Sequence, residues 1–384
     1  MSRLEAEDLY KVFGRRPAEA VEKLRSGADR EELRAEGTTA AVIDASFTVE
    51  SGQIFVVMGL SGSGKSTLLR MLNGLLEPTA GHVRFDGQDL TTLSPRELRE
   101  VRSHKISMVF QHFALFPHRS VMENAAYGLE VQGVPRAERE ERAIESLRLA
   151  GLEGWEKSFP DELSGGMQQR VGLARALATD ADLLLMDESF SALDPLIRRD
   201  MQDQLLELQK TLKKTIVFIT HDLNEAMRLG DNIAVMRDGR IVQIGSAEDI
   251  LVTPANDYVA SFTQDVDRSR VLSASAIMAE PEDGYRVADA PAKVHKDAPI
   301  IDLFTPCSTS EIPVAVVDDE GALLGVVPRQ RLLAVLGEPM KTVETPATSE
   351  NGEAASLAKD DKKDAVPSPR GEGDEPAEKV NAGA

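Results

Sequence analysis

The sequence contains a loop whose residue types and spacing suit it to holding phosphate groups. Residues 59–66 read GLSGSGKS and fit G-x-x-x-x-G-K-[ST] without a gap. Glycines let backbone N–H groups converge on phosphate oxygens, and the start of the following helix adds partial positive charge. Lys65 should reach the β- and γ-phosphates, and Ser66 should offer its hydroxyl to Mg²⁺. A Gly/Ser-rich turn that binds nothing is disfavoured, because an apolar run (Ile54–Met58) precedes the loop and a helical run (Thr67–Leu75) follows it.

A second apolar run, Leu183–Met186, ends in two carboxylates, Asp187 and Glu188. Ligands of open α/β sheets bind outside the carboxyl ends of the strands, so a strand that delivers charges there points to a site. Asp187 suits the Mg²⁺ shell, and Glu188 suits a general base that polarises an attacking water. Two acids after a strand are, taken alone, more often the start of a loop, and the phosphate loop reverses that preference.

Two further polar residues follow apolar runs in the same way. His221 follows Thr215–Thr220, at the strand end where the γ-phosphate should lie, and we interpret it as a phosphate-contacting switch residue. Gln111 follows Ile106–Phe110, and its amide can orient water or Mg²⁺. Ordinary structural or surface roles are the alternatives for both residues, and the other motifs favour the functional interpretation.

A second helix start with phosphate-binding character lies at Ser164-Gly165-Gly166, within the segment DELSGGMQQRVGLARAL. One γ-phosphate is not easily wrapped by two separate helix starts of the same small domain. The simplest arrangement is a head-to-tail dimer with two nucleotides between the copies, each held by Lys65 of one copy and Ser164 of the other. The γ-phosphate then biases a two-state contact that hydrolysis releases.

Composition limits the class of protein. The chain has 384 residues, 42% of them hydrophobic, which allows two or more domains with a sizeable core. There is no run of eighteen apolar residues to span a membrane, and the N-terminus lacks the apolar region of a secretory signal. The single cysteine, Cys307, excludes a disulfide framework and fits a cytosolic location. A net charge of −20 argues against nucleic acid as a partner.

The elements that must position these residues form an α/β pattern over about residues 2–254. Apolar runs alternate with helical patterns, which predicts a largely parallel sheet with helices on its faces. Residues 15–37 interrupt the pattern with charged residues and apolar ones at helical spacing, so we expect a helical insertion between the first two strands. The expected strands of the sheet are Ile54–Met58, Ile106–Phe110, Leu183–Met186, Thr215–Thr220 and Ile233–Met236.

The motifs occur in the order and spacing of the ATP-binding-cassette (ABC) ATPases, which the sequence resembles over about residues 4–262. The resemblance rests on the phosphate loop, Gln111, Leu163-Ser-Gly-Gly166, Leu183–Glu188, Ser191-Ala-Leu-Asp194 and His221. It implies an α/β P-loop ATPase domain over residues 1–265, with a RecA-like core, an antiparallel β subdomain and a helical subdomain. It also implies a homodimer that hydrolyses ATP with Mg²⁺.

The same resemblance assigns roles to individual residues. Ser164 and Gly166 would contact the γ-phosphate of the partner, and Asp194 would lie in a loop that crosses the dimer interface. Phe13 would stack on adenine, with Tyr10 a weaker candidate. The fifth signature residue is Met167, where many members have Gln, and this difference should not affect the phosphate contact. The catalytic residues would be Lys65, Gln111, Glu188 and His221. The metal ligands would be Ser66, Gln111 and Asp187. The nucleotide-binding residues would be Phe13, Gly59, Ser61, Gly62, Ser63, Gly64, Lys65, Ser66, Thr67, Ser164, Gly165, Gly166 and Asp194.

A closer resemblance is to the ATP-binding subunits of glycine betaine/proline betaine importers. It implies a peripheral subunit on the cytoplasmic face of the membrane, with an integral membrane permease and an extracytoplasmic substrate-binding protein as partners. In that family the segment after Gln111 receives the permease, and Phe113, Leu115, Phe116 and Pro117 could form the docking groove or simply pack in the core. An importer for an amino acid or polyamine, or a soluble ABC ATPase outside transport, are the alternatives. The resemblance rests on segments 54–61, 108–118, 160–167, 187–197 and 254–259.

The C-terminal part has a different sequence pattern from the α/β part. Residues 266–340 resemble a partial CBS-like module with a single motif at about 290–337, which a second copy would complete. We expect its first helix at Asp297–Phe304, strands at Val314–Val317 and Leu323–Val327, and a helix at Arg329–Leu336. The sequence after the second strand lacks the Thr or Ser and Asp of nucleotide-binding motifs, so packing or dimerisation is the alternative to sensing. Residues 341–384 are rich in charged and small residues and should form a disordered, acidic tail.

Overall fold

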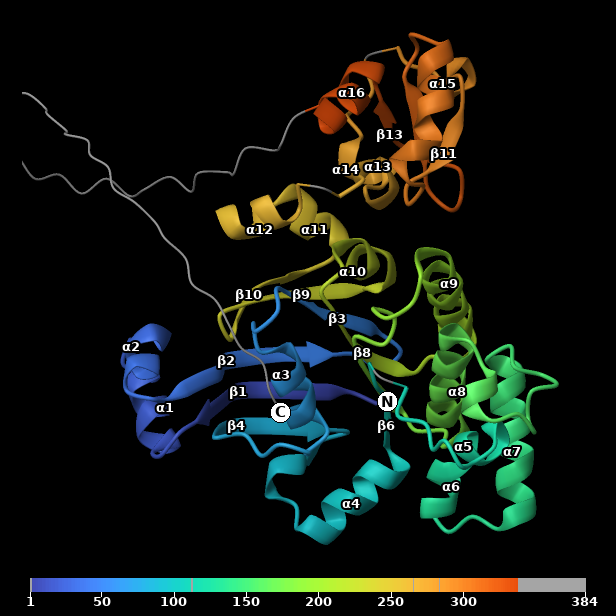
Figure 1. Cartoon of the computed structure of the whole chain (residues 1–384). Helices are drawn as coiled ribbons and strands as arrows, with labels where there is room; N and C mark the ends of the chain where they lie inside the picture. Colours follow the sequence, from blue (N-terminus) through green and yellow to red (C-terminus); the bar gives the residue numbers. More distant parts are fainter. Residues whose placement is uncertain (1, 112, 265, 283, 338–384) are drawn as a thin grey trace, which may run out of the picture. The chain divides into compact units, whose positions relative to one another are not determined.

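A six-stranded sheet forms the centre of this computed structural model, which describes residues 2–337 except 112, 265 and 283 (Figure 1). The strand order is β10-β9-β3-β8-β7-β6. Every neighbouring pair from β9 to β6 is parallel, and only β10 pairs in the antiparallel sense. The five predicted strands are all present, with ends within one residue of those expected. The bounds of the six strands are β3 Ile54–Met58, β6 Ile106–Val109, β7 Leu183–Asp187, β8 Thr215–Thr220, β9 Asn232–Arg237 and β10 Arg240–Gly245.

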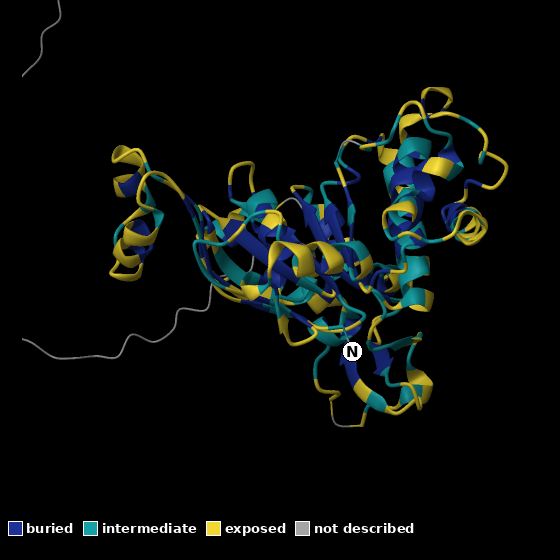
Figure 2. Cartoon of the chain, turned by 90° about the horizontal axis from the view of Figure 1, so that it is seen from below, coloured by how far each residue is buried: buried dark blue, intermediate teal, exposed yellow. Residues whose placement is uncertain are grey.

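The parallel strands are buried on both faces, which explains their nearly continuous apolar sequences. Successive residues of β3 alternate between two cores. Val56 and Met58 face a core shared with helix α9 (Pro195–Leu212), whereas Phe55 and Val57 face one shared with helix α3 (Lys65–Leu72). The buried residues accordingly gather on the strands (Figure 2).

The register of the parallel strands brings their carboxyl ends to one edge of the sheet. Met58 at the end of β3 pairs with Thr220 at the end of β8. Asp187 at the end of β7 pairs with Ile219 of β8. The loops that follow these three strands therefore start side by side, as ligand sites in open α/β sheets require.

A four-stranded antiparallel sheet, β2-β1-β4-β5, packs its apolar face against the α3 side of the central sheet. Two helices connect β1 to β2, at the place of the expected helical insertion. They bury their own apolar cluster, which includes Val21, Leu24 and Leu33, against these two strands. The bounds are β1 Leu4–Phe13, α1 Pro17–Arg25, α2 Arg30–Ala35, β2 Thr39–Val49, β4 Ala80–Phe85 and β5 Gln88–Asp89.

A helical region lies between β6 and β7 in the chain and has a separate apolar core, to which Val121, Leu147 and Val171 belong. Its first helix begins with a capping box in which Ser120 and Glu123 satisfy backbone N–H groups reciprocally. The buried Asn124 amide donates hydrogen bonds to three backbone carbonyls of the preceding turn and fixes that turn. The helices are α5 Val121–Ala125, α6 Tyr127–Val131, α7 Arg136–Leu149 and α8 Gly165–Ala178, and α4 (Pro95–His104) precedes β6.

The RecA-like core, antiparallel sheet and helical region match the predicted fold class. The helices that pack around the end of the central sheet are α10 Leu223–Leu229, α11 Ala247–Val252 and α12 Asp257–Phe262. None of the helices within the described residues is long and apolar enough to cross a membrane.

The C-terminal residues form a small three-stranded sheet, β11-β12-β13. Strands β12 (Val314–Val317) and β13 (Leu323–Val327) have the predicted bounds. The predicted helix at Asp297–Phe304 is wrong, because the chain makes a 3₁₀ turn only from Ile300 and an α-helix from Phe304. Pro299 explains the late start, since a proline keeps the preceding residue out of the helical region. The other elements are α13 Arg268–Val271, α14 Ala274–Ile277, β11 Lys293–His295, α15 Phe304–Thr309 and α16 Arg329–Gly337.

The CBS-like assignment and the domain boundaries at 265 and 340 stay predictions. The expected tail, residues 341–384, lies outside the described residues.

We predict that Leu24→Ala loosens the insertion without loosening the central sheet, because Leu24 is buried in the separate cluster of α1 and α2. Deleting such a side chain costs about 2–5 kcal/mol. Hydrogen exchange should therefore speed up in residues 17–35 by roughly tenfold or more, while β3 and β8 keep their protection. The exposed neighbour Glu22→Ala is the control. Equal loss of protection in β3 would contradict the separation of the two cores.

Candidate nucleotide-hydrolysis site

The phosphate loop joins β3 to α3, as predicted, and α3 begins at Lys65 rather than at Thr67. Gly64 caps this helix start with a φ of 106°, a left-handed conformation that glycine adopts without strain. A Cβ atom at Gly59 would lie 2.2 Å from the carbonyl oxygen of Met236, and one at Gly64 would lie 2.3 Å from that of Ala41. Strands β9 and β2 therefore pack directly against the loop backbone.

The Lys65 side chain lies along this loop and is only 4% exposed. Its Nζ donates hydrogen bonds to the carbonyl oxygens of Gly59, at 2.8 Å, and Leu60, at 3.2 Å. Nζ also lies 3.9 Å from Oε1 of Glu188. Burial lowers the pKa of Lys65, and the nearby carboxylates of Glu188 and Asp187 oppose this shift. The ammonium group is thus held between the loop and the acid pair.

Ser66 and Asp187 are brought together from α3 and β7, as a shared metal site requires. The Ser66 hydroxyl donates a hydrogen bond to Oδ1 of Asp187 at 3.1 Å. Burial raises the pKa of Asp187, and the hydrogen bond from Ser66 opposes the rise. One hydroxyl and one carboxylate are oxygen donors of the kind that Mg²⁺ binds, with phosphate and water as its remaining ligands. In the part of the chain that the structure describes, no cluster of three or more His, Cys, Asp or Glu offers another metal site.

The Glu188 carboxylate is the meeting point of the predicted catalytic residues. Its Oε2 lies 3.1 Å from Nδ1 of His221 and accepts a hydrogen bond from Nε2 of Gln111 at 3.3 Å. The Glu188 side chain is 18% exposed. Glu188 has a φ of 45°, an uncommon conformation for a residue with a side chain. Its backbone N–H donates to the carbonyl of Ile219 in β8, which helps to hold the carboxylate at the sheet edge.

Arg175 of helix α8 forms hydrogen bonds to the backbone of the segment after Gln111. Arg175 donates hydrogen bonds to the carbonyl oxygens of Ala114, at 2.6 Å, and Phe113, at 3.2 Å. Ala114 has a φ of 48°, so the guanidinium group holds a strained turn. Burial lowers the pKa of Arg175. Sequence reasoning missed this contact because 61 residues separate Arg175 from Ala114.

The four residues of the predicted docking groove are only partly available for contact with a partner. Leu115 packs against the core of the helical region, and the centroid of the Phe116 ring lies 4.5 Å from the centroid of the Tyr127 ring. Phe113 is half-buried and Pro117 is exposed. Leu115 and Phe116 therefore fit the packing interpretation, whereas Phe113 and Pro117 leave the docking interpretation open. The docking surface stays a prediction.

The second helix start is present and separate from the first. Ser164 caps α8, and its hydroxyl accepts a hydrogen bond from the N–H of Met167 at 3.3 Å. Ser164 and Gly165 are exposed. Across the described residues, no hydrogen bond or ion pair joins the 164–166 segment to the phosphate loop. The sharing of one nucleotide between Lys65 of one copy and Ser164 of another stays a prediction.

Of the two aromatic candidates for the adenine, only Phe13 is accessible. Its side chain is 45% exposed, and Nζ of Lys11 lies 5.3 Å from the ring centroid. Tyr10 is 5% exposed, because it belongs to the insertion cluster and Arg25 covers its ring. Tyr10 is therefore not available for stacking. Asp194 caps α9 through hydrogen bonds that its carboxylate accepts from two backbone N–H groups.

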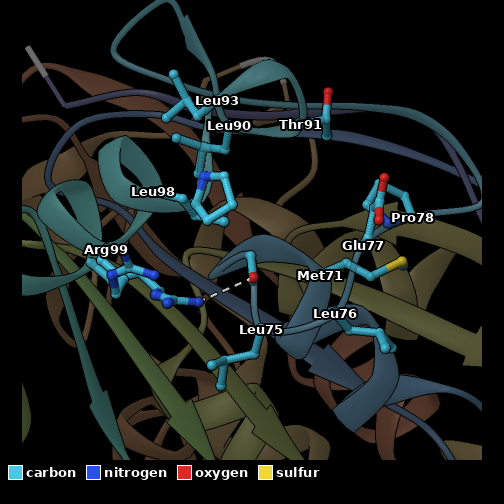
Figure 3. Close-up of a pocket in the computed structure, with 13 residues that line it drawn as sticks. Met71, Leu75, Leu76, Glu77, Pro78, Leu90, Thr91, Leu93, Leu98 and Arg99 are labelled. Atoms are coloured by element: carbon cyan, nitrogen blue, oxygen red, sulfur yellow. Dashed lines mark hydrogen bonds between the residues drawn. The ribbon is translucent and has the colours of Figure 1, made fainter.

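A cavity of about 460 Å³ lies at the other end of α3 from Lys65. Leucine side chains surround it, among them Leu75, Leu90 and Leu98, and the Arg102 guanidinium donates to the carbonyl of Gly74 beside it (Figure 3). None of the predicted nucleotide-binding residues lines this cavity. The cavity is therefore distinct from the hydrolysis site.

Comparison with known proteins places this geometry in a family. Residues 42–191 match the family model described as "ABC transporter". The glycine betaine transport ATP-binding protein OpuAA of Bacillus subtilis is 48% identical over 399 aligned residues, which cover 91% of this chain and 96% of the relative. The glycine betaine/proline betaine transport system ATP-binding protein ProV of Escherichia coli is 55% identical, over 73% of this chain and 71% of the relative.

Similar solved structures agree with this family assignment. The dimeric structure of MJ0796, a bacterial ABC transporter cassette, superposes with a TM-score of 0.54 at 31% identity and covers 64% of this chain and 98% of that one. The same cassette has been solved as a dimer in a post-hydrolysis state with ADP and Pi. The chain therefore belongs to the ATP-hydrolysing subunits of ABC transporters, in the group that contains the glycine betaine transport ATP-binding proteins.

Proposed function

We propose that this chain powers the import of glycine betaine, proline betaine or a related quaternary amine. The observation that carries the ATPase part is the Glu188 carboxylate, which lies within hydrogen-bonding distance of both His221 and Gln111. The observation that carries the substrate class is the 48% identity to OpuAA over nearly the whole of both chains.

The site residues support in-line attack of water on the γ-phosphate. Glu188 Oε2 accepts the proton of the attacking water, and the amide of Gln111 and the imidazole of His221 orient the carboxylate and the γ-phosphate. Lys65, which is almost fully buried, neutralises charge that develops on the phosphate oxygens. Ser66 and Asp187 would hold Mg²⁺, which supplies charge neutralisation at the phosphates when bound.

A homodimer completes the site in this proposal. Ser164, at the exposed start of α8, and Gly166, which is buried in the first turn of α8, would contact the γ-phosphate held by Lys65 of the partner copy, and Phe13 would stack on the adenine. The dimeric form of the solved cassette MJ0796 supports this arrangement. The remaining partners would be an integral membrane permease, which docks near Phe113–Pro117, and an extracytoplasmic substrate-binding protein. The subunit would then lie at the cytoplasmic face of the membrane.

Transport tests the substrate class. We expect cells that carry this chain with its permease and no other betaine importer to take up labelled glycine betaine at high salt. Glu188→Gln should abolish uptake, because the amide cannot accept the proton of the attacking water, while ATP binding is retained. Labelled methionine and a polyamine serve as competing solutes. Uptake of one of these in place of glycine betaine would contradict the substrate class and leave the ATPase intact.

Complementation between variants tests the shared site. Lys65→Ala and Ser164→Arg should each lose ATP hydrolysis as pure proteins, because every site in either dimer carries a defect. In an equal mixture, mixed dimers contain one site with both residues intact. ATP hydrolysis should therefore reappear in the mixture of full-length chains. A mixture as inactive as its components would show that Lys65 and Ser164 do not serve one nucleotide from two chains.

Asp187→Asn should stabilise the nucleotide-free chain while weakening its response to Mg²⁺ and ATP. Burial raises the pKa of Asp187, so the native state binds this proton more tightly than the unfolded state does. The penalty for the charged carboxylate is present above the folded-state pKa and disappears as the pH falls through it. We expect a rise in Tm of about 2–4 °C at neutral pH that shrinks on acidification. A Tm difference that grows on acidification would contradict the assigned direction.

A further inference from the structure

The Arg198 side chain, on the first turn of α9, connects two loops that border the Glu188 carboxylate. Its guanidinium group donates to the carbonyl oxygens of Phe190 (3.2 Å), Ser191 (3.3 Å) and Leu193 (3.2 Å) in the loop after β7. Its Nη1 donates at 2.9 Å to Oδ2 of Asp222, the residue after His221. One planar group thus holds the backbone of one loop and the carboxylate of another.

A second contact lies one helical turn further along α9. The buried Gln202 amide donates to Oε1 of the buried Glu225, in α10, at 3.1 Å. The other oxygen of Glu225 accepts a hydrogen bond from Thr220, the residue before His221. Residues four apart on a helix share a face, so Arg198 and Gln202 together attach one face of α9 to both sides of His221.

These contacts are stronger than an ordinary surface ion pair. The side chains of Arg198 and Asp222 are 26% and 30% exposed, and three carbonyl oxygens accept from Nε and Nη2 of the guanidinium group. Asp222 is fixed in turn, because its Oδ1 accepts from the N–H groups of Asn224 and Glu225 at the start of α10. Lysine could not replace this arrangement, since its ammonium group lacks the fork of donors.

The loop that Arg198 holds also contacts the backbone of Glu188 and the side chain of Gln111. The Ser191 hydroxyl donates to the carbonyl oxygen of Glu188 at 2.8 Å and accepts from Nε2 of Gln111 at 3.4 Å. His221 contacts the Glu188 carboxylate from the opposite loop. A displacement of the 190–194 loop therefore reaches Asp222, the neighbour of His221, through the Arg198 side chain.

We propose that Arg198 is a positioning residue that couples the 190–194 loop to His221. Contact of this loop with a partner copy then sets the placement of His221 beside Glu188 in the same chain, so that hydrolysis follows dimer closure. The inference rests on the proposed function, because it requires that the chain hydrolyses ATP as a dimer.

The test compares variants of the full-length chain by ATP hydrolysis, with Tm measured for each. Arg198→Met should lower kcat by roughly tenfold or more, the size of a lost positioning effect, with KM for ATP changed by less than about threefold. Arg198→Lys should retain an intermediate kcat, because it keeps the ion pair with Asp222 and loses the carbonyl contacts. Arg199→Met, at the exposed neighbouring position, is the matched control and should match the wild-type chain.

Two further measurements separate coupling from simple structural support. Asp222→Asn keeps the helix cap and removes the charge, and combining it with Arg198→Met should lower kcat no further than the worse single variant. In the Glu188→Gln background, Arg198→Met should leave ATP-dependent dimerisation intact, as measured by size-exclusion chromatography.

The outcomes are distinct. A kcat within twofold of wild type for Arg198→Met overturns the proposal. Loss of ATP-dependent dimerisation in Arg198→Met together with loss of hydrolysis also overturns it. Fully additive effects of Arg198→Met and Asp222→Asn on kcat overturn it as well. If Arg198→Met fails to fold, a wild-type kcat in a stably folded Arg198→Lys overturns it, and an intermediate kcat supports it. Absence of hydrolysis in the wild-type chain, or of ATP-dependent dimers in Glu188→Gln alone, would count against the proposed function instead.

Discussion

The structure depends on the mutual compensation of three charged groups at one edge of the central sheet. Lys65 is almost fully buried, and Asp187 and Glu188 lie close enough to oppose the lowering of its pKa. Loss of both acids would leave the buried Lys65 ammonium group without an opposing charge, at a cost of several kcal/mol. The parallel strands meet this constraint, because their register delivers the acids and the phosphate loop to one edge of the sheet.

A second layer of polar contacts fixes the geometry around these charges. Glu188 is held in a left-handed conformation by hydrogen bonds to its backbone from Ser191 and by its own N–H bond to Ile219. Arg175 and Arg198 hold neighbouring loops through backbone carbonyls rather than through acids alone. Strain of this kind persists only where the surroundings over-determine it, and here each strained residue has such support.

The sequence predicts much of the site and less of what supports it. Strand positions followed from apolar runs, and Glu188, His221 and Gln111 converge because polar residues after parallel strands share an edge. Arg198 and Arg175 were missed, since a surface-type residue on a helix gives no local sign of a partner 24 or 61 residues away. Tyr10 is not available for stacking because it is buried in the insertion cluster, and Pro299 delays a helix that the resemblance to a CBS motif predicts.

Two glycines of the phosphate loop are required by packing as well as by phosphate. Gly59 and Gly64 leave no room for a side chain because carbonyls of β9 and β2 lie against them, whereas Gly62 faces open space. A related chain that had lost catalysis would still need both glycines in order to fold, but it would be free to replace Lys65 and Glu188. A degenerate, non-hydrolysing member of this family is therefore recognised by its lysine and its glutamate, and a preserved pattern of glycines reports only that the fold has survived.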